Sequence, residues 1–273
     1  MDAPAPPAKA PVTPPRTRGA AALSARDDGG RTRLEGLRQE GSLRLLFPRA
    51  YGAALEAVAL NTSGGLTGGD RLRLDARAGP GARLLLTTQA CERAYRAAGG
   101  HAAVDVALRA DEGARLDWLP QETILFEGAR LHRTLRLEVA PTATALLVEP
   151  FVFGRLARGE ALRDAALRDR WEVRVGGRLR FADALRLEGD VHALLDRRGV
   201  GGGARALATV LLAGPGAEAR LREARERTDG AASLVGDGLL VARLLAPDGL
   251  LLRRRLVPLI VALAGPIPKV WTL

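Results

Sequence analysis

The sequence predicts a mainly β protein built from stacked layers of short strands. Short segments in which apolar and polar residues alternate recur between about residues 31 and 186. Glycine-rich turns separate these segments, as they do in layered β architectures. Helical periodicity is found mainly in the last third of the chain. A length of 273 residues and a hydrophobic content of 47% are enough for one large folded domain.

The predicted strands lie along most of the chain, and turn residues separate them. In order they cover residues 31–39, 42–46, 54–60, 71–76, 83–88, 103–109, 115–118, 131–139, 143–148, 170–175, 179–186 and 239–245. The segment 131–139 alternates well, and Arg133 falls on its apolar side. The segment 143–148 is apolar throughout, as is typical of a strand that is covered on both faces. Gly176 and Gly177 predict the turn of a hairpin between the two segments that flank them.

Two or three helices are predicted, mostly towards the C-terminus. Residues 217–227 and 250–264 both have apolar residues at helical spacing. In the second helix we expect the basic run 253–255 to face solvent and Pro258 to bend the helix. A further helix is predicted around 159–169, where alanine and leucine residues fall on one side.

The chain is predicted to be one domain with a short tail. Residues 1–18 are rich in Pro and Ala and are expected to form a disordered tail, whereas 19–273 form the domain. The lone Cys91 permits no intrachain disulfide, which suits a reducing cytoplasm. The N-terminus lacks a signal-peptide pattern, and no apolar run reaches the ~18–20 residues that a membrane helix needs. We therefore expect a cytoplasmic protein that has no membrane partner.

The formal net charge is +10, and nearly all of the positive charge is arginine. A basic chain raises the hypothesis of a nucleic-acid partner. However, the arginines are spread along the chain and interleaved with acidic residues and leucine, and no aromatic-studded basic segment accompanies them. We therefore expect no nucleic-acid binding and favour an acidic protein partner.

Residues 61–71 form the most distinctive stretch, because two glycine pairs precede an acidic residue. The pairs are Gly64–Gly65 and Gly68–Gly69, and the acid is Asp70. Paired glycines indicate a backbone that bends sharply or is approached closely. One interpretation is a tight loop between two strands. The other is a bent backbone that presents Asp70 at a functional surface.

The usual signatures of catalysis are absent from the sequence. Lys9 and Lys269 are the only lysines, and neither follows a glycine-rich loop, so nucleotide binding through a P-loop is excluded. There is no Gly-x-Ser-x-Gly sequence, and Cys91 has no nucleophile signature, so it is interpreted as a small, half-buried residue. His101, His132 and His192 are far apart in the sequence and are interpreted as surface or strand residues rather than metal ligands.

Three carboxylates stand at strand ends or turns beside apolar segments: Asp70, Glu122 and Glu149. Such acids commonly cap turns or pair with arginine. Alternatively, oxygen ligands of this kind pass along a hard or borderline cation such as Ni²⁺ when they bind it weakly enough to release it. Both interpretations stay open from residue types alone.

Taken together, the motifs resemble the family of the urease accessory protein UreD, also called UreH. The matching segments are Gly64-Gly65-Leu66-Thr67-Gly68-Gly69-Asp70, Leu86-Thr87-Thr88-Gln89-Ala90 with Tyr95-Arg96, Leu119-Pro120-Gln121-Glu122-Thr123-Ile124 with Phe126, and Glu149-Pro150-Phe151-Val152-Phe153-Gly154-Arg155 with Gly159-Glu160. Their order and spacing match over roughly residues 30 to 190, and residues 266–271 resemble the closing segment of the family. The family more often has prolines where this chain has Thr62-Ser63.

The resemblance implies a fold of irregular, stacked β-helical sheets with a few helices. It also implies a non-catalytic chaperone that binds apo-urease subunits and the accessory protein UreF, and that recruits the GTPase UreG through UreF. No cofactor is expected to be tightly bound, whereas nickel is expected in transit. Under this interpretation Asp70, Glu122 and Glu149 line a conduit for nickel. Thr87, Thr88 and Gln89 add further oxygens, and the four loop glycines form its wall.

Three hypotheses follow. The first is a nickel-insertion chaperone for urease, with the helix 250–264 in contact with UreF. The second is a β-rich interaction scaffold that has no role with metal. The third is an enzyme that uses Asp70 and Glu122 as acid and base. Co-purification with urease subunits separates the first hypothesis from the other two.

Overall fold

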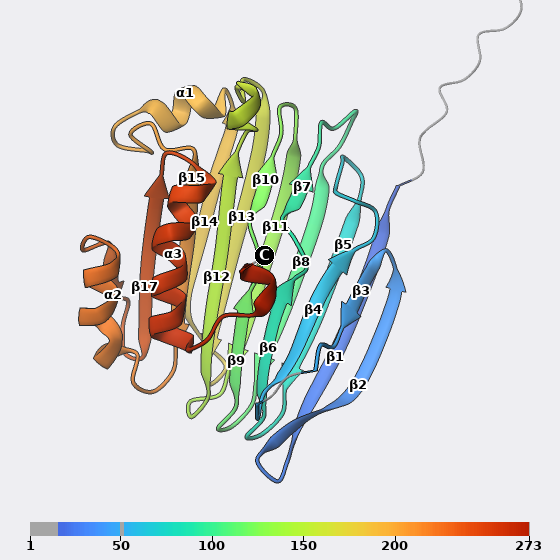
Figure 1. The fold of residues 1–273 in the computed structure, drawn as a ribbon, viewed down its shortest axis with the longest axis vertical. Helices are drawn as coiled ribbons and strands as arrows, with labels where there is room; N and C mark the ends of the chain where they lie inside the picture. Colours follow the sequence, from blue (N-terminus) through green and yellow to red (C-terminus); the bar gives the residue numbers. More distant parts are fainter. Residues whose placement is uncertain (1–15, 50–51, 273) are drawn as a thin grey trace, which may run out of the picture.

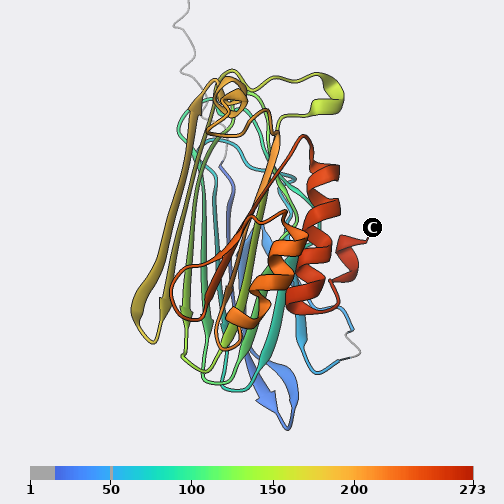
Figure 2. The same cartoon turned by 90° about the vertical axis from the view of Figure 1, so that its left-hand side faces the viewer.

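The computed structural model describes residues 16–49 and 52–272, which form a sandwich of two facing β-sheets (Figures 1 and 2). Sheet A contains, in spatial order, β14 (Arg178–Gly189), β13 (Ala165–Val175), β11 (Arg130–Val139), β8 (Ala102–Ala110), β5 (Arg71–Ala78), β1 (Arg18–Asp28) and β2 (Arg31–Gly41). Sheet B contains β16 (Ala232–Leu234), β17 (Leu239–Ala246), β15 (Ala206–Ala213), β12 (Thr144–Phe153), β9 (Arg115–Leu119), β6 (Arg83–Thr88), β4 (Leu55–Asn61) and β3 (Leu43–Leu46). Two short strands, β7 (Glu92–Ala94) and β10 (Thr123–Leu125), extend sheet B beside β12.

From β4 to β13 the chain passes alternately through the two sheets. The strands β5, β8, β11 and β13 are therefore parallel neighbours in sheet A, and β4, β6, β9 and β12 are parallel neighbours in sheet B. Parallel strands need a crossover between them, and here each crossover is a strand of the opposite sheet. This arrangement confirms the expected mainly β fold of stacked, β-helical sheets.

The alternation of residues in each strand explains why two layers form. In β5 the side chains of Leu72, Leu74 and Ala76 are buried, whereas Arg73 between them is exposed and Asp75 is half-buried. Successive residues of a strand point to opposite faces, so sheet A buries its apolar face against sheet B and leaves its charged face in solvent. Arg73 and Asp75 form an ion pair on that outer face.

Sheet B is covered on both faces, which distinguishes it from sheet A. Leu147 and Phe151 of β12 belong to the core between the sheets, whereas Leu146 and Val148 belong to a second core on the outer side of sheet B. Helix α3 (Gly249–Ala264) covers this second core. Figure 2 shows α3 and α2 (Leu221–Arg227) along one outer side of the sandwich.

Helix α3 begins at a capped turn and is amphipathic. The side chain of Asp248 accepts a hydrogen bond from the backbone N–H of Leu251 at 2.7 Å, which satisfies one free donor of the first turn. Its buried leucine and isoleucine residues recur every three or four positions and pack on sheet B: Leu252, Leu256, Leu259, Ile260 and Leu263. The remaining helices are short, namely α1 (Val191–Asp196) and the 3₁₀ turns η1 (Leu156–Arg158), η2 (Glu218–Arg220) and η3 (Lys269–Trp271).

The structure confirms the predicted strands and the two C-terminal helices, but it corrects two details. The helix predicted around 159–169 is wrong, because only the turn η1 forms nearby and β13 begins at Ala165. The small residues there are buried because β13 lies between β11 and β14. Arg253 does not face solvent freely with its two neighbours, since its side chain is only 24% exposed and pairs with Glu122.

The predicted tail lies largely outside the described residues. Residues 1–15 are not described, whereas β1 begins at Arg18 and pairs with both β2 and β5. Within the described part of the chain, no helix is long and apolar enough to cross a membrane.

Candidate functional site: a polar seam between the sheets

The two ends of the sandwich carry connections of different length. At one end, short turns join the strands at 79–82, 111–114 and 140–143. At the other end, the connections are longer: 62–70, 89–101, 120–129 and 154–164. The motifs that carry the family resemblance lie in these longer connections or in the strands beside them. We call this end of the sandwich the motif end.

The glycine pairs shape the first connection of the motif end. Gly64 and Gly69 have φ angles of 78° and 94°, and residues other than glycine rarely adopt this backbone conformation. A Cβ atom on Gly65 would lie 2.3 Å from the ring of Tyr95, and one on Gly68 would lie 2.1 Å from a backbone oxygen of the neighbouring loop. The loop therefore packs so closely that only glycine fits at these positions.

Asp70 organises this glycine loop. Its carboxylate accepts hydrogen bonds from the backbone N–H groups of Thr17 and Thr67, each at 2.8 Å. Asp70 is buried, but it does not line the cavity described below. The arrangement ties the segment before β1 to the loop before β5.

Glu122 lies elsewhere, in a network on the outer side of sheet B. Arg253 of α3 donates from Nε to Glu122 Oε1 at 2.9 Å, and Cys91 Sγ donates to Glu122 Oε2 at 3.3 Å. Burial opposes ionisation of Glu122, but the hydrogen bonds and charge of Arg253 hold its pKa below the ordinary value. The pKa of Cys91 is raised to about 11, first by burial and then by the charge of Glu122. This thiol is therefore protonated and unreactive at neutral pH.

The C-terminal turn is attached to the same network. Trp271 Nε1 donates to the carbonyl oxygen of Leu119 at 3.0 Å and contacts Thr87 Oγ1 at 3.3 Å. Gln121 Nε2 donates to the carbonyl oxygens of Gln89 at 3.0 Å and Val270 at 3.2 Å. Thr87 therefore faces the C-terminal turn and not the space between the sheets.

Glu149 occupies a third place, in the interior between the two sheets. It lies on β12, is fully buried, and accepts a hydrogen bond from Trp118 Nε1 at 2.6 Å. The guanidinium of Arg133, from β11 in the opposite sheet, forms an ion pair with it. Arg133 is also almost completely buried and reaches Thr123 Oγ1 at 3.4 Å.

Two further carboxylates lie near Arg133. Asp169 is the direct neighbour of Arg133 in the register of β11 and β13, and its Oδ2 accepts a hydrogen bond from Trp171 Nε1 at 2.9 Å. Glu92 accepts a hydrogen bond from Asn61 Nδ2 at 3.1 Å. Burial raises the pKa of both Asp169 and Glu92, and the charge of Arg133 opposes this rise.

These buried and half-buried polar side chains form a connected series between the sheets, which we call the polar seam: Asn61, Glu92, Thr123, Arg133, Glu149 and Asp169. Beyond Asp169, Asp183 of β14 pairs with Arg243 of β17 at 2.6 Å and joins the two sheets at their edge. The sequence analysis missed Glu92, Arg133 and Asp169 as site residues. Arg133 did carry a signal, because it is a charged residue on the apolar side of a strand.

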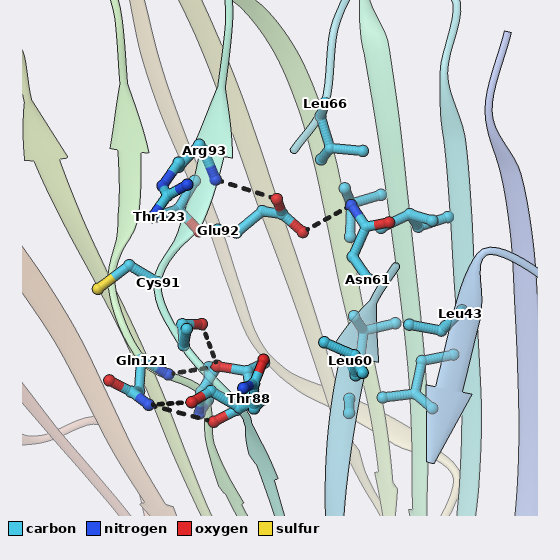
Figure 3. Close-up of a pocket in the computed structure, with 18 of the residues that line it drawn as sticks. Leu43, Leu60, Asn61, Leu66, Thr88, Cys91, Glu92, Arg93, Gln121 and Thr123 are labelled. Carbon is cyan, nitrogen blue, oxygen red and sulfur yellow. Dashed lines mark hydrogen bonds between the residues drawn. The ribbon is translucent and has the colours of Figure 1, made fainter. Parts of the chain in front are cut away.

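A cavity of about 260 Å³ lies between the sheets beside the seam. Apolar side chains form most of its wall, and Thr88, Gln89 and Cys91 line it together with the seam residues Glu92 and Arg133. Figure 3 shows Glu92 and Asn61 directed towards each other, with Thr88 and Gln121 in a separate group. Within residues 16–49 and 52–272, no three His, Cys, Asp or Glu side chains are grouped to hold a metal ion.

The structure therefore separates the residues that the sequence proposed as one conduit. Glu149 lies in the seam, and Thr88 and Gln89 line the adjoining cavity. By contrast, Asp70 caps the glycine loop, while Glu122 and Thr87 hold α3 and the C-terminal turn. All three acids are buried, but they lie in three different places.

Comparison with known proteins identifies the family. The model of the UreD urease accessory protein family matches residues 17–272. A urease accessory protein UreD from Rhizobium rhizogenes is 49% identical over 271 residues, covering 97% of this chain and 99% of the relative. The urease accessory protein UreD 1 of Brucella melitensis is 48% identical over 265 residues, covering 94% and 95%. With a family match over nearly its whole length and relatives this similar, the chain belongs to the UreD family of urease accessory proteins.

Proposed function

We propose that this chain is a urease maturation chaperone that binds apo-urease and helps to deliver nickel to the urease active site. Membership of the UreD family supports a role in urease maturation. The complete burial of Glu149 inside the sandwich is the observation that carries the proposed metal role. A buried carboxylate costs free energy, and an apolar residue would fill the same place in a purely structural core.

In this proposal nickel is a passing substrate and not a resident cofactor. Ni²⁺ accepts oxygen ligands, and the seam offers carboxylate and hydroxyl oxygens from Glu92, Thr123, Glu149 and Asp169. A passage must release what it binds, so the proposal requires weak binding at these oxygens. The route runs from the cavity near Gln89, through the seam, to the edge beyond Asp169.

The proposal gives the sequence-predicted residues different tasks. Glu149, Thr88 and Gln89 act on the route itself. Asp70, Glu122 and Thr87 act indirectly, because they hold the loops and the C-terminal turn in place. The chain performs no bond chemistry in this account.

The partners proposed are apo-urease, UreF and, through UreF, the GTPase UreG. Helix α3 is the surface proposed for UreF. Leu250 and Val261 are 63% and 46% exposed. They are eleven residues apart, or about three turns, and therefore lie on the same side of the helix. This exposed side is opposite the leucines that pack on sheet B.

A second candidate function is a β-rich scaffold that binds proteins without handling metal. The mostly apolar wall of the cavity favours it, as does the lack of a three-ligand group among the described residues. Both candidates require protein partners, so only the fate of nickel distinguishes them.

The distinguishing experiment replaces Glu149 with glutamine, which keeps the shape and removes the charge. The variant is co-expressed with the urease subunits and the other accessory proteins, and the nickel bound per purified urease is measured. We expect nickel content and urease activity to fall about tenfold, while co-purification with urease is retained.

The matched control is Glu138→Gln, which removes an acid from the exposed face of β11. Nickel content with this control should equal that of the unmodified chain. If Glu149→Gln and Glu138→Gln give the same nickel content, the conduit is wrong and the scaffold function stands. If Glu149→Gln also abolishes co-purification, its effect is structural and the conduit loses its support.

A further inference from the structure

Arg133 places a positive charge in the middle of the seam. A positive charge repels cations, so it is unexpected on a route for Ni²⁺. Its side chain is 5% exposed, and that of its partner Glu149 is 1% exposed. Burial lowers the pKa of Arg133, while the charges of Asp169 and Glu92 raise it. Guanidinium keeps its proton under almost all conditions in proteins, so this charge is permanent.

The negative groups around Arg133 outnumber it. Glu149 forms an ion pair with the guanidinium, Asp169 is the direct neighbour of Arg133 in the strand register, and the charges of Asp169 and Glu92 both act on Arg133. Two buried polar atoms of this group also lack a hydrogen-bond partner, namely Arg133 Nε and Asp169 Oδ1. Buried polar atoms nearly always have a partner, so these atoms indicate a site that is built for more than its present contacts.

A purely structural role does not account for this arrangement. Buried ion pairs are commonly replaced by apolar residues of similar size without loss of stability. The neighbouring inward positions of β11 hold Leu131 and Leu135, and both are fully buried in the same core. An apolar residue in place of Arg133, with an apolar residue in place of Glu149, would continue that pattern.

We propose that Arg133 is a built-in counter-cation that keeps the carboxylates of the seam from retaining a divalent metal ion. The guanidinium holds the carboxylate of Glu149 and lies beside Asp169 in the strand register, so it competes with a dication for their oxygens. A passing ion is then bound weakly and released. This inference rests on the proposed nickel route. It identifies Arg133 as the residue that lets the route release Ni²⁺ and prevents its retention.

The proposal predicts a gain of metal binding when the charge is removed. In purified full-length chain, Arg133→Met should bind Ni²⁺ about a hundredfold more tightly than the unmodified chain, because a unit charge close to a dication is strongly repulsive in the interior. Isothermal titration with Ni²⁺ measures the affinity. In the double variant Arg133→Met/Glu149→Gln the gain should disappear, because the principal carboxylate is gone.

Two controls separate the charge from general damage to the fold. Arg136→Met removes an exposed arginine from the outer face of the same strand and should leave Ni²⁺ affinity unchanged. Arg133→Lys keeps the positive charge and should also show no gain. The melting temperature gives a second readout, since Ni²⁺ should stabilise Arg133→Met and should not stabilise the double variant.

The inference is overturned if Arg133→Met folds and gains no Ni²⁺ affinity, or if the gain survives in the double variant. If Arg133→Met does not fold even with Ni²⁺, Arg133→Gln carries the same test, and no gain in that variant overturns the inference. The titration needs no urease. It therefore reports on Arg133 alone, whereas the nickel content of urease made with Glu149→Gln reports on the route.

Discussion

At the scale of single residues, two buried glutamates pair with arginine in two different parts of the fold. Glu122 is held by Arg253 at the outer side of sheet B, and the pair anchors helix α3. Glu149 is held by Arg133 between the sheets, and this pair joins β12 to β11 of the opposite sheet. The partner is an arginine in both cases, so the location decides which elements each pair joins.

Another residue-scale feature joins two histidines that are distant in the sequence. The rings of His101 and His132 are stacked with their centroids 3.7 Å apart on the outer face of sheet A. Burial lowers the pKa of His132, and the neighbouring His101 and Arg168 lower it further, while Glu188 opposes them. The fold therefore brings together two histidines that are 31 positions apart in the sequence, with His101 exposed and His132 on strand β11.

This pair predicts a dependence of stability on pH. Because the pKa of His132 is lower in the folded chain than its ordinary value of 6.5, the unfolded chain binds more protons as the pH falls through this range. The free energy of unfolding should therefore decrease as the pH is lowered from 7 towards 5. Urea unfolding at a series of pH values measures this, and His132→Gln should lose part of the decrease.

The control for this prediction is His192, which lies in α1 and contacts the carbonyl oxygen of Phe153 at 3.0 Å. Replacing His192 with glutamine should leave the contribution of the stacked pair in place. If His132→Gln has the same pH dependence as the unmodified chain, the stacked pair does not affect stability in this range.

At the scale of elements, helix α3 has one side that packs on sheet B and one side that is exposed to solvent. Its inner side packs on sheet B through buried leucines, and Arg253 fixes it to Glu122. Pro258 lies within the helix, yet the helix continues to Ala264 because its inner side remains packed. Figure 1 shows the C-terminal turn next to α3, across the strands of sheet B.

The exposed side of α3 gives the element-scale prediction. Leu250→Glu combined with Val261→Glu should place charges on the surface proposed for UreF and remove co-purification of UreF from cells that express both proteins. The fold should persist, because neither side chain belongs to the buried side of the helix. Circular dichroism checks the fold, and a pull-down measures the partner.

Leu179→Glu is the matched control, because Leu179 is 49% exposed on β14 of sheet A, away from α3. UreF should still co-purify with this variant. If UreF binds the α3 variant as well as it binds the control, the assignment of α3 to UreF is wrong.

At the scale of the whole molecule, sheet B is shared by two hydrophobic cores. Its strand β12 supplies Leu147 to the inner core and Leu146 to the outer core, so neither core is complete without the other face of the same strand. This argues that the described part of the chain unfolds as one unit, although chains longer than about 150 residues often do not.

The whole-molecule prediction follows from that shared strand. Hydrogen exchange measured at increasing urea concentrations should show β11 of the inner core and α3 of the outer core losing protection at the same concentration. Loss of protection in β11 and α3 at the same urea concentration would identify a single cooperative domain. Loss of protection in α3 at a clearly lower urea concentration would instead show that the outer core opens independently.

The sequence determined the fold class because alternation is a local property. Segments such as 131–139 alternate between apolar and polar residues, and this alone specifies a strand with one buried face. The local pattern wrongly predicted a helix at 159–169. The small residues there have helical spacing, but they are buried because β13 lies between β11 and β14. It also missed β1, whose alanine-rich sequence has a weak preference for strands, and which is held by β2 and β5.

The motifs also determined the family, because several short segments in a fixed order are recognisable without any structure. Only the tertiary structure decided which of their residues meet. Asp70, Glu122 and Glu149 look alike in sequence, yet the crossing of the chain between the sheets sends them to a loop, an outer surface and the interior. Which charges become neighbours depends on the register between strands that are distant in the chain, and that register is set by packing of the whole sandwich.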